Sequence, residues 1–431
     1  MLNNLFKHLL LKNKIYLSRD ELDTLRFLLL KKQLLHAHQN IPYYKTAFDK
    51  AGVKPFDFKS IEDLSLYPIL TKDIIRQNNL QLLNLKVLFP DCFKSHTSGS
   101  TGQPMWTYYD LRSWVRKKYL IKARARMECG LKPNDKILIF ENASQNSTDH
   151  SNILFRTLKS HYKVISIFEP NEETFQKLMT FSPVALYGSP SYFFQFAQFI
   201  DKNNFHLHSI KRIFTSSEYF QQTVREYINK IFNAEVYDIY GSTEFKEVAW
   251  ECEKHEGYHI NEDEVFVEVL KDGKQVSPGE VGNIVITDLR NKSMPLIRYQ
   301  MSDKGILINR KCSCGRTLSM MKPYAGRSSE YIILPGNQFL SPYLFTTNIE
   351  KINGLLQYQI VQTEKEKILV SVVTNNEDFN RIAGTIKDIL SKITNHLMEI
   401  EVLLKTALDI EENGKFKVVK NLVLGHKEIK I

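Results

Sequence analysis

The spacing of hydrophobic and polar residues changes along the chain, and each change predicts a different kind of element. Leucines recur at helical intervals over the first 40 residues, which predicts helices there. The pattern predicts a second helix within 64–79, with Thr71 as its N-terminal cap, and a basic helix over 111–128. The N-terminal third is therefore expected to be mainly helical.

Further along, short apolar runs alternate with segments of helical spacing. Strands separated by helices at this interval predict α/β layering, because each parallel strand needs a crossover helix. Five runs follow this pattern: 137–140, 164–168, 184–187, 212–214 and 236–240.

The pattern changes again in the last 170 or so residues. Residues 264–310 predict an antiparallel β section with tight turns, such as one at Asp272-Gly273. From about residue 326 a β-rich piece is followed by β-α-β-like alternation to the end. We therefore expect an α/β protein with two domains. The large layered domain, which includes the β section, spans 1–326, and a small α+β domain spans 327–431.

Composition narrows the class of protein. The 431 residues are 43% hydrophobic and 25% charged, which excludes collagen-like, disordered and disulfide-scaffold proteins. The net charge of +10 is scattered rather than clustered, so we do not expect a nucleic-acid partner. The five cysteines do not suit a disulfide framework, and no apolar run reaches the ~18 residues of a membrane span. We expect a cytoplasmic protein without a transmembrane segment.

Residues 95–104 carry the sharpest local signal, SHTSGSTGQP. Glycines and hydroxyl residues packed this closely let a chain wrap a polyphosphate with backbone N–H groups and side-chain hydroxyls. The segment is not a Walker loop, because no Gly-Lys-Ser/Thr follows. Taken alone, a flexible loop rich in serine and glycine remains an equal alternative.

Two more segments place acidic residues after apolar runs. Residues 238–244, DIYGSTE, end in Glu244, and residues 295–303, PLIRYQMSD, place Arg298 and Asp303 after a strand-like run. The order TSGSTG, YGSTE, RY-x-x-x-D, GR and a C-terminal Gly-Lys resembles the adenylate-forming enzymes. Within them the chain looks most similar to phenylacetate–CoA ligases and CapK-type capsular-polysaccharide proteins, on its length, IPYYK, LYPILTKD and DIYGSTE.

The resemblance implies a site for ATP along most of the chain. The phosphate loop would hold the β- and γ-phosphates, TSSE at 215–218 would line the adenine, Tyr240 would stack on it, and Asp303 would hold the ribose hydroxyls. The nucleotide-binding residues so implied are Thr97, Ser98, Gly99, Ser100, Thr101, Gly102, Ser217, Glu218, Tyr240, Gly241, Ser242 and Asp303.

It also implies four residues close to the chemistry. Thr243 would contact the α-phosphate, and Glu244 would bind Mg²⁺. Arg327 belongs to the GR motif at the domain junction, and Lys415 would swing in for adenylation on a mobile C-terminal domain. A lysine and a magnesium ion suit this step, because a carboxylate must approach a phosphate of the same charge sign.

Three positions depart from the family pattern. Ser302 stands where glycine is usual before the ribose-binding aspartate, and Ser329 replaces the hinge acid. Gln103 ends the phosphate loop where phenylacetate–CoA ligases commonly have lysine. The last departure favours the CapK-type branch over phenylacetate as substrate.

A second group of residues has the spacing of a metal site. Cys252 and His255 form a C-x2-H pair. Cys312 and Cys314 form a C-x-C pair inside KCSCGR, and His259 competes with His255 as the fourth ligand. Three cysteines and one histidine suit a tetrahedral structural zinc, and four reduced side chains without metal are the alternative.

The expected activity is ATP-dependent activation of a carboxylic acid as an acyl-adenylate, with release of pyrophosphate. The acyl group then passes to coenzyme A or to another acceptor. The alternative is an amine or hydroxyl acceptor, or adenylyl transfer, in polysaccharide biosynthesis without coenzyme A. The oligomeric state is open, with a homodimer as one alternative. Mixed polar and aromatic residues near the expected acid pocket favour a polar acid, such as a sugar acid or an amino acid: Asn142, Gln145, Asn146, Tyr187, Ser189 and Tyr192.

Overall fold

The structure is a computed structural model of the whole chain. It describes residues 12–84, 86, 92–96, 105–141, 161–167, 169–324, 332–335, 338–340, 345, 348–349, 352–408, 411 and 416–423. The chain divides into two compact units. The first comprises Met1–Gly130 and Ile239–Tyr324, and the second comprises Leu131–Asp238 and Ala325–Ile431.

The first unit begins with the helices that the leucine spacing predicts. Ser18 and Glu21 form a capping box at the start of the longest helix, α2, so its first N–H groups are satisfied. Thr71 caps α4 as predicted, with its hydroxyl accepting a hydrogen bond from the N–H of Ile74 at 3.3 Å. The helical segments are η1 (Lys12–Tyr16), α2 (Arg19–Asn40), α3 (Pro42–Lys50), η2 (Pro55–Asp57), η3 (Ile61–Leu66), α4 (Lys72–Gln77), α5 (Leu111–Val115), η5 (Arg116–Ile121) and α6 (Lys122–Glu128).

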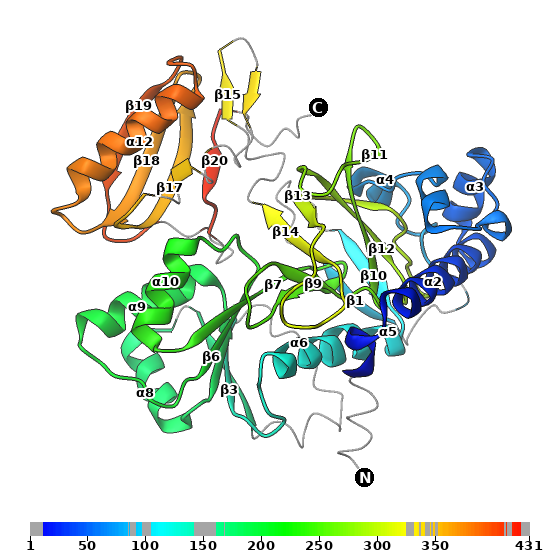
Figure 1. The fold of residues 1–431 in the computed structure, drawn as a ribbon, viewed down its shortest axis with the longest axis horizontal. Coiled ribbons are helices and arrows are strands. Elements are labelled where there is room, and N and C mark those ends of the chain that lie inside the picture. The colour runs from blue at the N-terminus through cyan, green and yellow to red at the C-terminus, as the bar shows by residue number, and fades with distance from the viewer. Residues whose placement is uncertain are drawn as a thin grey trace. The chain divides into compact units, whose positions relative to one another are not determined.

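An antiparallel sheet completes the first unit, in the order β11-β10-β12-β13-β14-β9-β8-β7 (Figure 1). This confirms the expected β section. Asp272 and Gly273 have φ angles of 51° and 76°, the left-handed pair that a two-residue hairpin requires. Its strands are β7 (Glu235–Ser242), which enters from the second unit, β8 (Lys246–Glu251), β9 (Tyr258–Ile260), β10 (Val265–Lys271), β11 (Lys274–Gln275), β12 (Gly282–Asp288), β13 (Tyr299–Ile308) and β14 (Met320–Tyr324). A separate hairpin joins β1 (Phe93–His96) to β2 (Trp106–Tyr109).

The second unit contains the predicted α/β layers. Its parallel strands have the order β6-β5-β3-β4, and the helices between them bury their apolar faces in one hydrophobic core. The elements are β3 (Ile137–Glu141), β4 (Tyr162–Ser166), α8 (Asn171–Phe181), β5 (Ala185–Gly188), α9 (Pro190–Lys202), β6 (Arg212–Ser216) and α10 (Gln222–Phe232).

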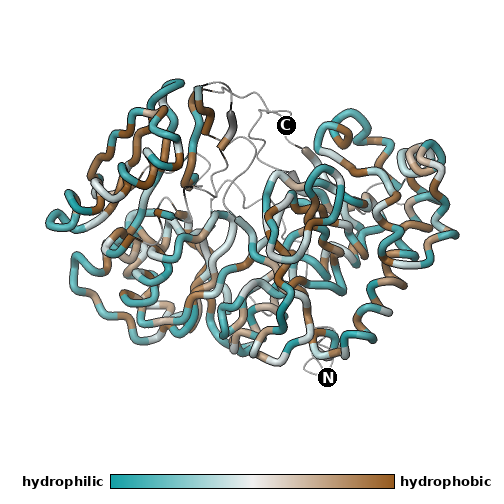
Figure 2. Tube along the Cα trace, turned by 45° about the horizontal axis from the view of Figure 1, so that its top comes forward, coloured by the Kyte–Doolittle hydropathy of each residue, from teal (hydrophilic) through white to brown (hydrophobic). Residues whose placement is uncertain are grey.

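The C-terminal segment adds a second sheet to this unit, in the order β19-β18-β17-β20, with helix α12 lying across it (Figure 1). Strands β17 and β18 are mostly hydrophobic, and the turns at their ends are hydrophilic (Figure 2).

The elements of the C-terminal segment are β15 (Ile332–Leu334), β16 (Gln338–Leu340), β17 (Leu355–Glu364), β18 (Lys367–Thr374), α12 (Phe379–Ile393), β19 (Glu399–Leu404) and β20 (Val419–Asn421). Strands β15 and β16 pair with each other in a separate two-stranded sheet.

This segment packs against α10. The side-chain amide of Gln221 donates to the carbonyl of Tyr358 at 3.1 Å, and the hydroxyl of Thr223 donates to the carbonyl of Leu356 at 2.9 Å. The compact units therefore group 325–431 with 131–238. The division into domains at residue 326 stays a prediction. Among the helices described, none has the length and apolar character needed to cross a membrane.

Candidate active site

Two residues assigned separately from the sequence meet in the first unit. Tyr240 lies near the end of β7 and Asp303 lies in β13, two strands that are not neighbours in the sheet. The hydroxyl of Tyr240 donates a hydrogen bond to Oδ2 of Asp303 at 3.0 Å. The structure therefore brings the expected adenine-stacking and ribose-binding side chains together, and the exposed Ser302 beside Asp303 does not prevent it.

The acidic end of the YGSTE segment is held by two tyrosines. Tyr299, at the start of β13, donates to Oε1 of the buried Glu244 at 3.3 Å. Burial and the neighbouring Glu244 raise the pKa of Tyr299, so it remains a donor. The hydroxyl of Tyr109 lies 2.8 Å from the carbonyl oxygen of Thr243 and 2.7 Å from that of Glu244. Neither tyrosine was assigned from the sequence, although Tyr299 lies inside the PLIRYQMSD motif.

The hairpin that carries this segment explains its glycine. Ser242 pairs with Lys246 across the β7–β8 turn, and the hydroxyl of Ser242 accepts a hydrogen bond from the N–H of Phe245 at 3.2 Å. A side chain at Gly241 would collide with the carbonyl of Lys246. Lys246 itself has a φ of 62°, an uncommon angle for a residue with a side chain. The turn is therefore tightly determined by backbone sterics.

Lys246 faces the hairpin that leads into the phosphate loop. Its ammonium donates to the hydroxyl of Ser95 at 2.9 Å and lies 5.3 Å from the ring centres of both Tyr109 and Trp114. Burial, followed by the positive charge of Lys118, lowers the pKa of Lys246 to about 7. Lys246 lies two residues after Glu244, so its place next to the YGSTE motif could have indicated a site residue. The sequence analysis assigned it no role.

The expected adenine-lining residues lie in the second unit, at the end of β6. Ser217 is exposed and has a φ of 82°, a strained angle that often occurs at functional sites. The carboxylate of Glu218 accepts hydrogen bonds from the hydroxyl and N–H of Ser191, at 2.8 and 3.1 Å. It also accepts one from the N–H of Phe416 at 3.0 Å. Glu218 thus ties the start of helix α9 to the residue that follows Lys415.

Several expected site residues lie outside the described residues: Thr97, Ser98, Gly99, Ser100, Thr101, Gly102, Arg327 and Lys415. Among the expected acid-pocket residues, Asn142, Gln145 and Asn146 also lie outside them. The structure gives two others a structural role. The ring of Tyr192 is buried 4.6 Å from that of Phe140, and Ser189 caps α9. These contacts do not test the pocket expected at the two positions, which stays a prediction.

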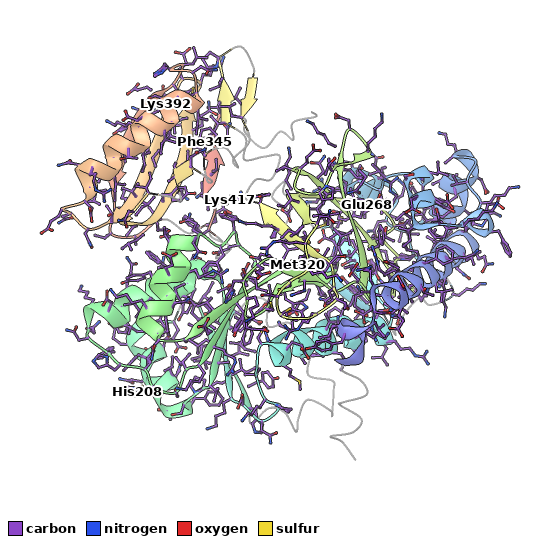
Figure 3. The ribbon with its side chains drawn as sticks, in the orientation of Figure 1. His208, Glu268, Met320, Phe345, Lys392 and Lys417 are labelled. Carbon is purple, nitrogen blue, oxygen red and sulfur yellow. The ribbon has the colours of Figure 1, made fainter. Side chains whose placement is uncertain are left out.

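Arg298, in the same motif as Asp303, is buried and holds the framework. Its guanidinium forms two hydrogen bonds with Glu268, at 2.9 and 3.1 Å, and reaches the carbonyls of Ser65 and Tyr67. Glu268 is labelled within the strands of this unit in Figure 3. These contacts join β10 to the N-terminal helical region and fix the segment just before Asp303.

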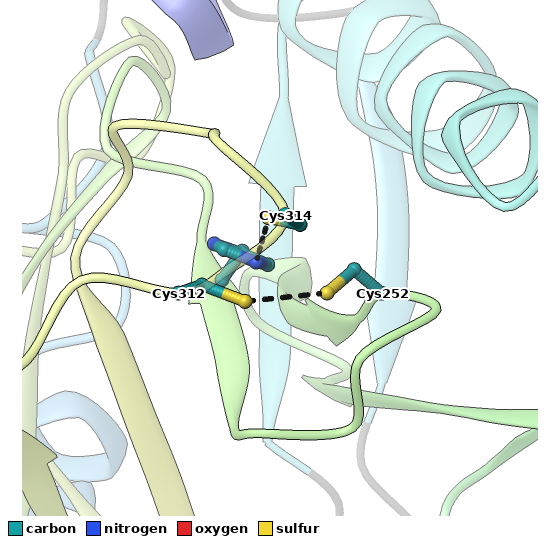
Figure 4. A group of neighbouring side chains, drawn as sticks. Cys252, Cys312 and Cys314 are labelled. Atoms are coloured by element: carbon teal, nitrogen blue, oxygen red, sulfur yellow. Dashed lines mark hydrogen bonds between the residues drawn. The ribbon is translucent and has the colours of Figure 1, made fainter.

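The predicted metal-ligand group is present with one change. Cys252, Cys312 and Cys314 converge as Figure 4 shows, and their sulfurs lie with a ring nitrogen of His259 within 4.8 Å of one another. The sulfurs of Cys252 and Cys312 are 3.6 Å apart, and Cys314 Sγ is 3.3 Å from His259 Nε2. An ideal tetrahedron with bonds of about 2.3 Å spaces sulfurs by about 3.8 Å, so the group fits zinc.

His255 does not join this group. It lies in the turn that follows Cys252, with a φ of 50°, and its Nδ1 faces the carboxylate of Glu251 at 3.6 Å. The choice of His255 as the fourth ligand is therefore corrected to His259. Pairing of β14 with β9 places His259 opposite Met320, close to the 312–314 turn, and local spacing could not reveal this.

Comparisons with known proteins agree with this geometry. No family model matches the chain. The phenylacetate-coenzyme A ligase of Escherichia coli (strain K12) is 29% identical over 339 residues, covering 74% of this chain and 74% of that protein. Protein CapK of Staphylococcus aureus is 24% identical over 340 residues, covering 76% and 73%. A crystal structure of 2-hydroxyisobutyryl-CoA ligase in the postadenylation state, in complex with R3-HIB-AMP, superposes with a TM-score of 0.78 at 20% identity, over 95% of this chain and 91% of that chain.

The fold and the similarity together define an adenylate-forming ligase. Within that class, the chain is similar to phenylacetate-coenzyme A ligases and to protein CapK.

Proposed function

We propose that this protein uses ATP to convert a carboxylic acid into an acyl-adenylate, with release of pyrophosphate, and then transfers the acyl group to coenzyme A. The observation that carries this proposal is the hydrogen bond between Tyr240 and Asp303, beside the buried Glu244. Three side chains assigned to adenine, ribose and metal thus belong to one unit of the fold.

The chain's own residues would act mainly by positioning. Tyr240 would stack on the adenine while its hydroxyl orients Asp303, whose carboxylate would bind the ribose hydroxyls. Thr243 would contact the α-phosphate. The hydroxyl of Tyr109 holds this turn in place by contacting the carbonyl oxygens of Thr243 and Glu244. Lys415 would neutralise the charge that develops as the two anions approach. The loop from Thr97 to Gly102 would hold the β- and γ-phosphates.

Glu244 would hold Mg²⁺. Carboxylate oxygen is the ligand that magnesium prefers, and Tyr299 leaves part of this carboxylate available after donating to Oε1. When bound, magnesium would supply charge neutralisation at the phosphates.

Coenzyme A is the proposed acceptor, because several similar proteins are named as coenzyme A ligases. An amine or hydroxyl acceptor, as in polysaccharide biosynthesis, is the alternative. A polar acid remains the proposed substrate class, since the half-buried Tyr187 lies at the end of β5 in the region expected to receive it.

We also propose a structural zinc at Cys252, His259, Cys312 and Cys314. Its support is the convergence of four ligand atoms from the residue that follows β8, from β9 and from the segment between β13 and β14. Such a site would join β9 and the end of β8 to the segment that links β13, which bears Asp303, to β14. It would leave no open position for catalysis.

Pyrophosphate exchange tests the proposed function. The purified protein would be incubated with ATP, Mg²⁺, labelled pyrophosphate and a panel of carboxylic acids, first without an acceptor. Exchange that depends on one acid and is lost in Asp303→Ala is the expected result. Adding coenzyme A should then give a thioester; a product only with an amine or sugar favours the alternative. Exchange in the absence of every acid, or none with any acid while nucleotide binding is intact, would contradict the proposal.

A further inference from the structure

Lys246 is a cation whose surroundings call for a negative partner. Among the described residues, its ammonium has one hydrogen-bond partner, the neutral hydroxyl of Ser95. No carboxylate of the described residues lies within ion-pair distance of it, whereas most enclosed cations of the same unit are paired, as Lys117 is with Asp288 at 3.2 Å. A partly buried charge without a counter-ion is costly unless a ligand supplies one.

The immediate environment increases this need. The rings of Tyr109 and Trp114 lie beside the ammonium, and the ammonium of a second lysine, Lys118, lies 4.6 Å from the ring centre of Trp114. Lys118, Lys122 and Lys117 repel the charge of Lys246, and Glu244 offsets part of this repulsion. Aromatic faces favour a cation, but they do not neutralise it, so the positive potential stays concentrated at this point.

The position of the lysine indicates which substrate would meet it. Tyr109 joins the two regions: its ring faces Lys246, and its hydroxyl holds the carbonyl of Thr243. Thr243 is the proposed contact of the α-phosphate, to which the acid becomes attached. Lys246 therefore lies about one tyrosine side chain away from the point where the acyl group begins. Aromatic walls suit a carbon chain better than they suit the β- and γ-phosphates, which are assigned to the 97–102 loop.

We propose that Lys246 binds a negatively charged group at the far end of the acid, so that the preferred substrates are dicarboxylic acids or acids with another anionic group. This inference rests on the proposed function and defines its substrate class. Ser95 would orient the ammonium, and Tyr109 and Trp114 would contact the connecting carbons. Specificity follows because an acid without the second charge leaves the lysine unpaired.

Matched acids test the proposal directly. Pyrophosphate exchange would be measured with straight-chain dicarboxylates of four to eight carbons and with monocarboxylates of the same lengths. Wild type should favour the dicarboxylate at its best length, and Lys246→Met should lose about 10- to 100-fold in kcat/KM for it, the range expected for a hydrogen bond to a charged group. The loss should appear in the KM for the acid, with the KM for ATP unchanged. Lys246→Gln, which can still reach Ser95, should behave in the same way.

Lys271→Met is the matched control. It removes the same charge from an exposed lysine at the β10–β11 turn, and β12, β13, β14 and β9 separate β10 from β8 in the sheet. It should keep the preference. A wild-type preference for monocarboxylates, a preference that survives Lys246→Met, or a change in the KM for ATP instead would overturn the proposal while leaving the function intact.

Calorimetry with α,β-methylene-ATP, Mg²⁺ and each acid separates the two hypotheses when no acid supports exchange. Nucleotide binding without exchange by any acid would count against the proposed function. Tighter binding of a dicarboxylate to wild type than to Lys246→Met would still support the lysine site, and equal binding would overturn it.

Discussion

The hydroxyl of Tyr240 donates to the carboxylate of Asp303 across 3.0 Å, linking the end of β7 to β13. The sequence separates these residues by more than 60 positions, and the sheet places other strands between them. The contact gives the aromatic ring a fixed orientation and directs the carboxylate. A nucleotide would therefore meet a surface that is already organised, which lowers the entropy cost of binding.

Removing this hydroxyl should weaken ATP binding more than it slows the chemistry. Tyr240→Phe keeps the ring but loses the hydrogen bond, so the KM for ATP should rise about fivefold, equivalent to about 1 kcal/mol. Asp303→Asn should cost more, because the amide cannot accept the same bonds. Steady-state exchange at varied ATP measures both. An unchanged KM in Tyr240→Phe would show that the contact does not organise the nucleotide site.

Lys415 should matter for the first half-reaction in particular. Lys415 would neutralise charge as the substrate carboxylate approaches the α-phosphate. Lys415→Ala should therefore lower the adenylation rate by about 10²- to 10³-fold. Transfer of a chemically prepared acyl-adenylate to coenzyme A should change much less, because that step does not need the lysine. Lys417→Ala, two residues away and paired with Glu411 at 3.2 Å, is the control. Equal losses in both half-reactions would contradict this division of roles.

The metal site predicts a difference between two histidines that lie four residues apart. His259→Gln and Cys312→Ser should lower bound zinc from about one equivalent to below about 0.1 and reduce the melting temperature, because structural zinc contributes folding free energy. His255→Gln should keep the metal. Elemental analysis of protein purified without chelator or added zinc gives the answer. A wild-type protein that contains no zinc would contradict the proposed metal site.

A buried ion pair should make stability depend on acid pH. Burial acts to raise the pKa of Asp263, but Arg124 and Arg116 outweigh it and hold the pKa well below its ordinary value. Below the ordinary pKa of an aspartate, about 3.9, the unfolded state binds more protons than the folded state, so this contribution is lost as the pH falls through the folded pKa.

Asp263→Asn should therefore destabilise the protein by about 3–5 kcal/mol at pH 7, because it removes the carboxylate partner of the buried Arg124, whereas Arg116 keeps its pair with Glu264. The difference in the free energy of unfolding between wild type and Asp263→Asn should remain constant down to about pH 5. It should narrow below the ordinary pKa of about 3.9. Urea denaturation at several pH values measures it. Asp73→Asn, which breaks an exposed pair with Arg76, should have little effect at any pH. A gap that widens in acid would contradict the assigned pKa direction.

The sequence by itself determined the class of protein and much of its framework. The order of TSGSTG, YGSTE and RY-x-x-x-D indicated the adenylate-forming enzymes, and the similarity confirms that class. Local patterns also predicted the alternating strands and helices, the cap at Thr71 and the turn at Asp272-Gly273. These succeed because hydrophobic periodicity, caps and turn angles depend on residues close together in the chain.

Only the tertiary structure decided which distant side chains meet. His259 replaces His255 because pairing of β9 with β14 brings it to the cysteines. Tyr109, Tyr299 and Lys246 enter the site through contacts that span 55 to 151 positions of sequence. The C-terminal segment likewise joins residues 131–238 in one core. Such contacts depend on the order in which strands pair in the sheet, and this order leaves no periodic trace in the sequence.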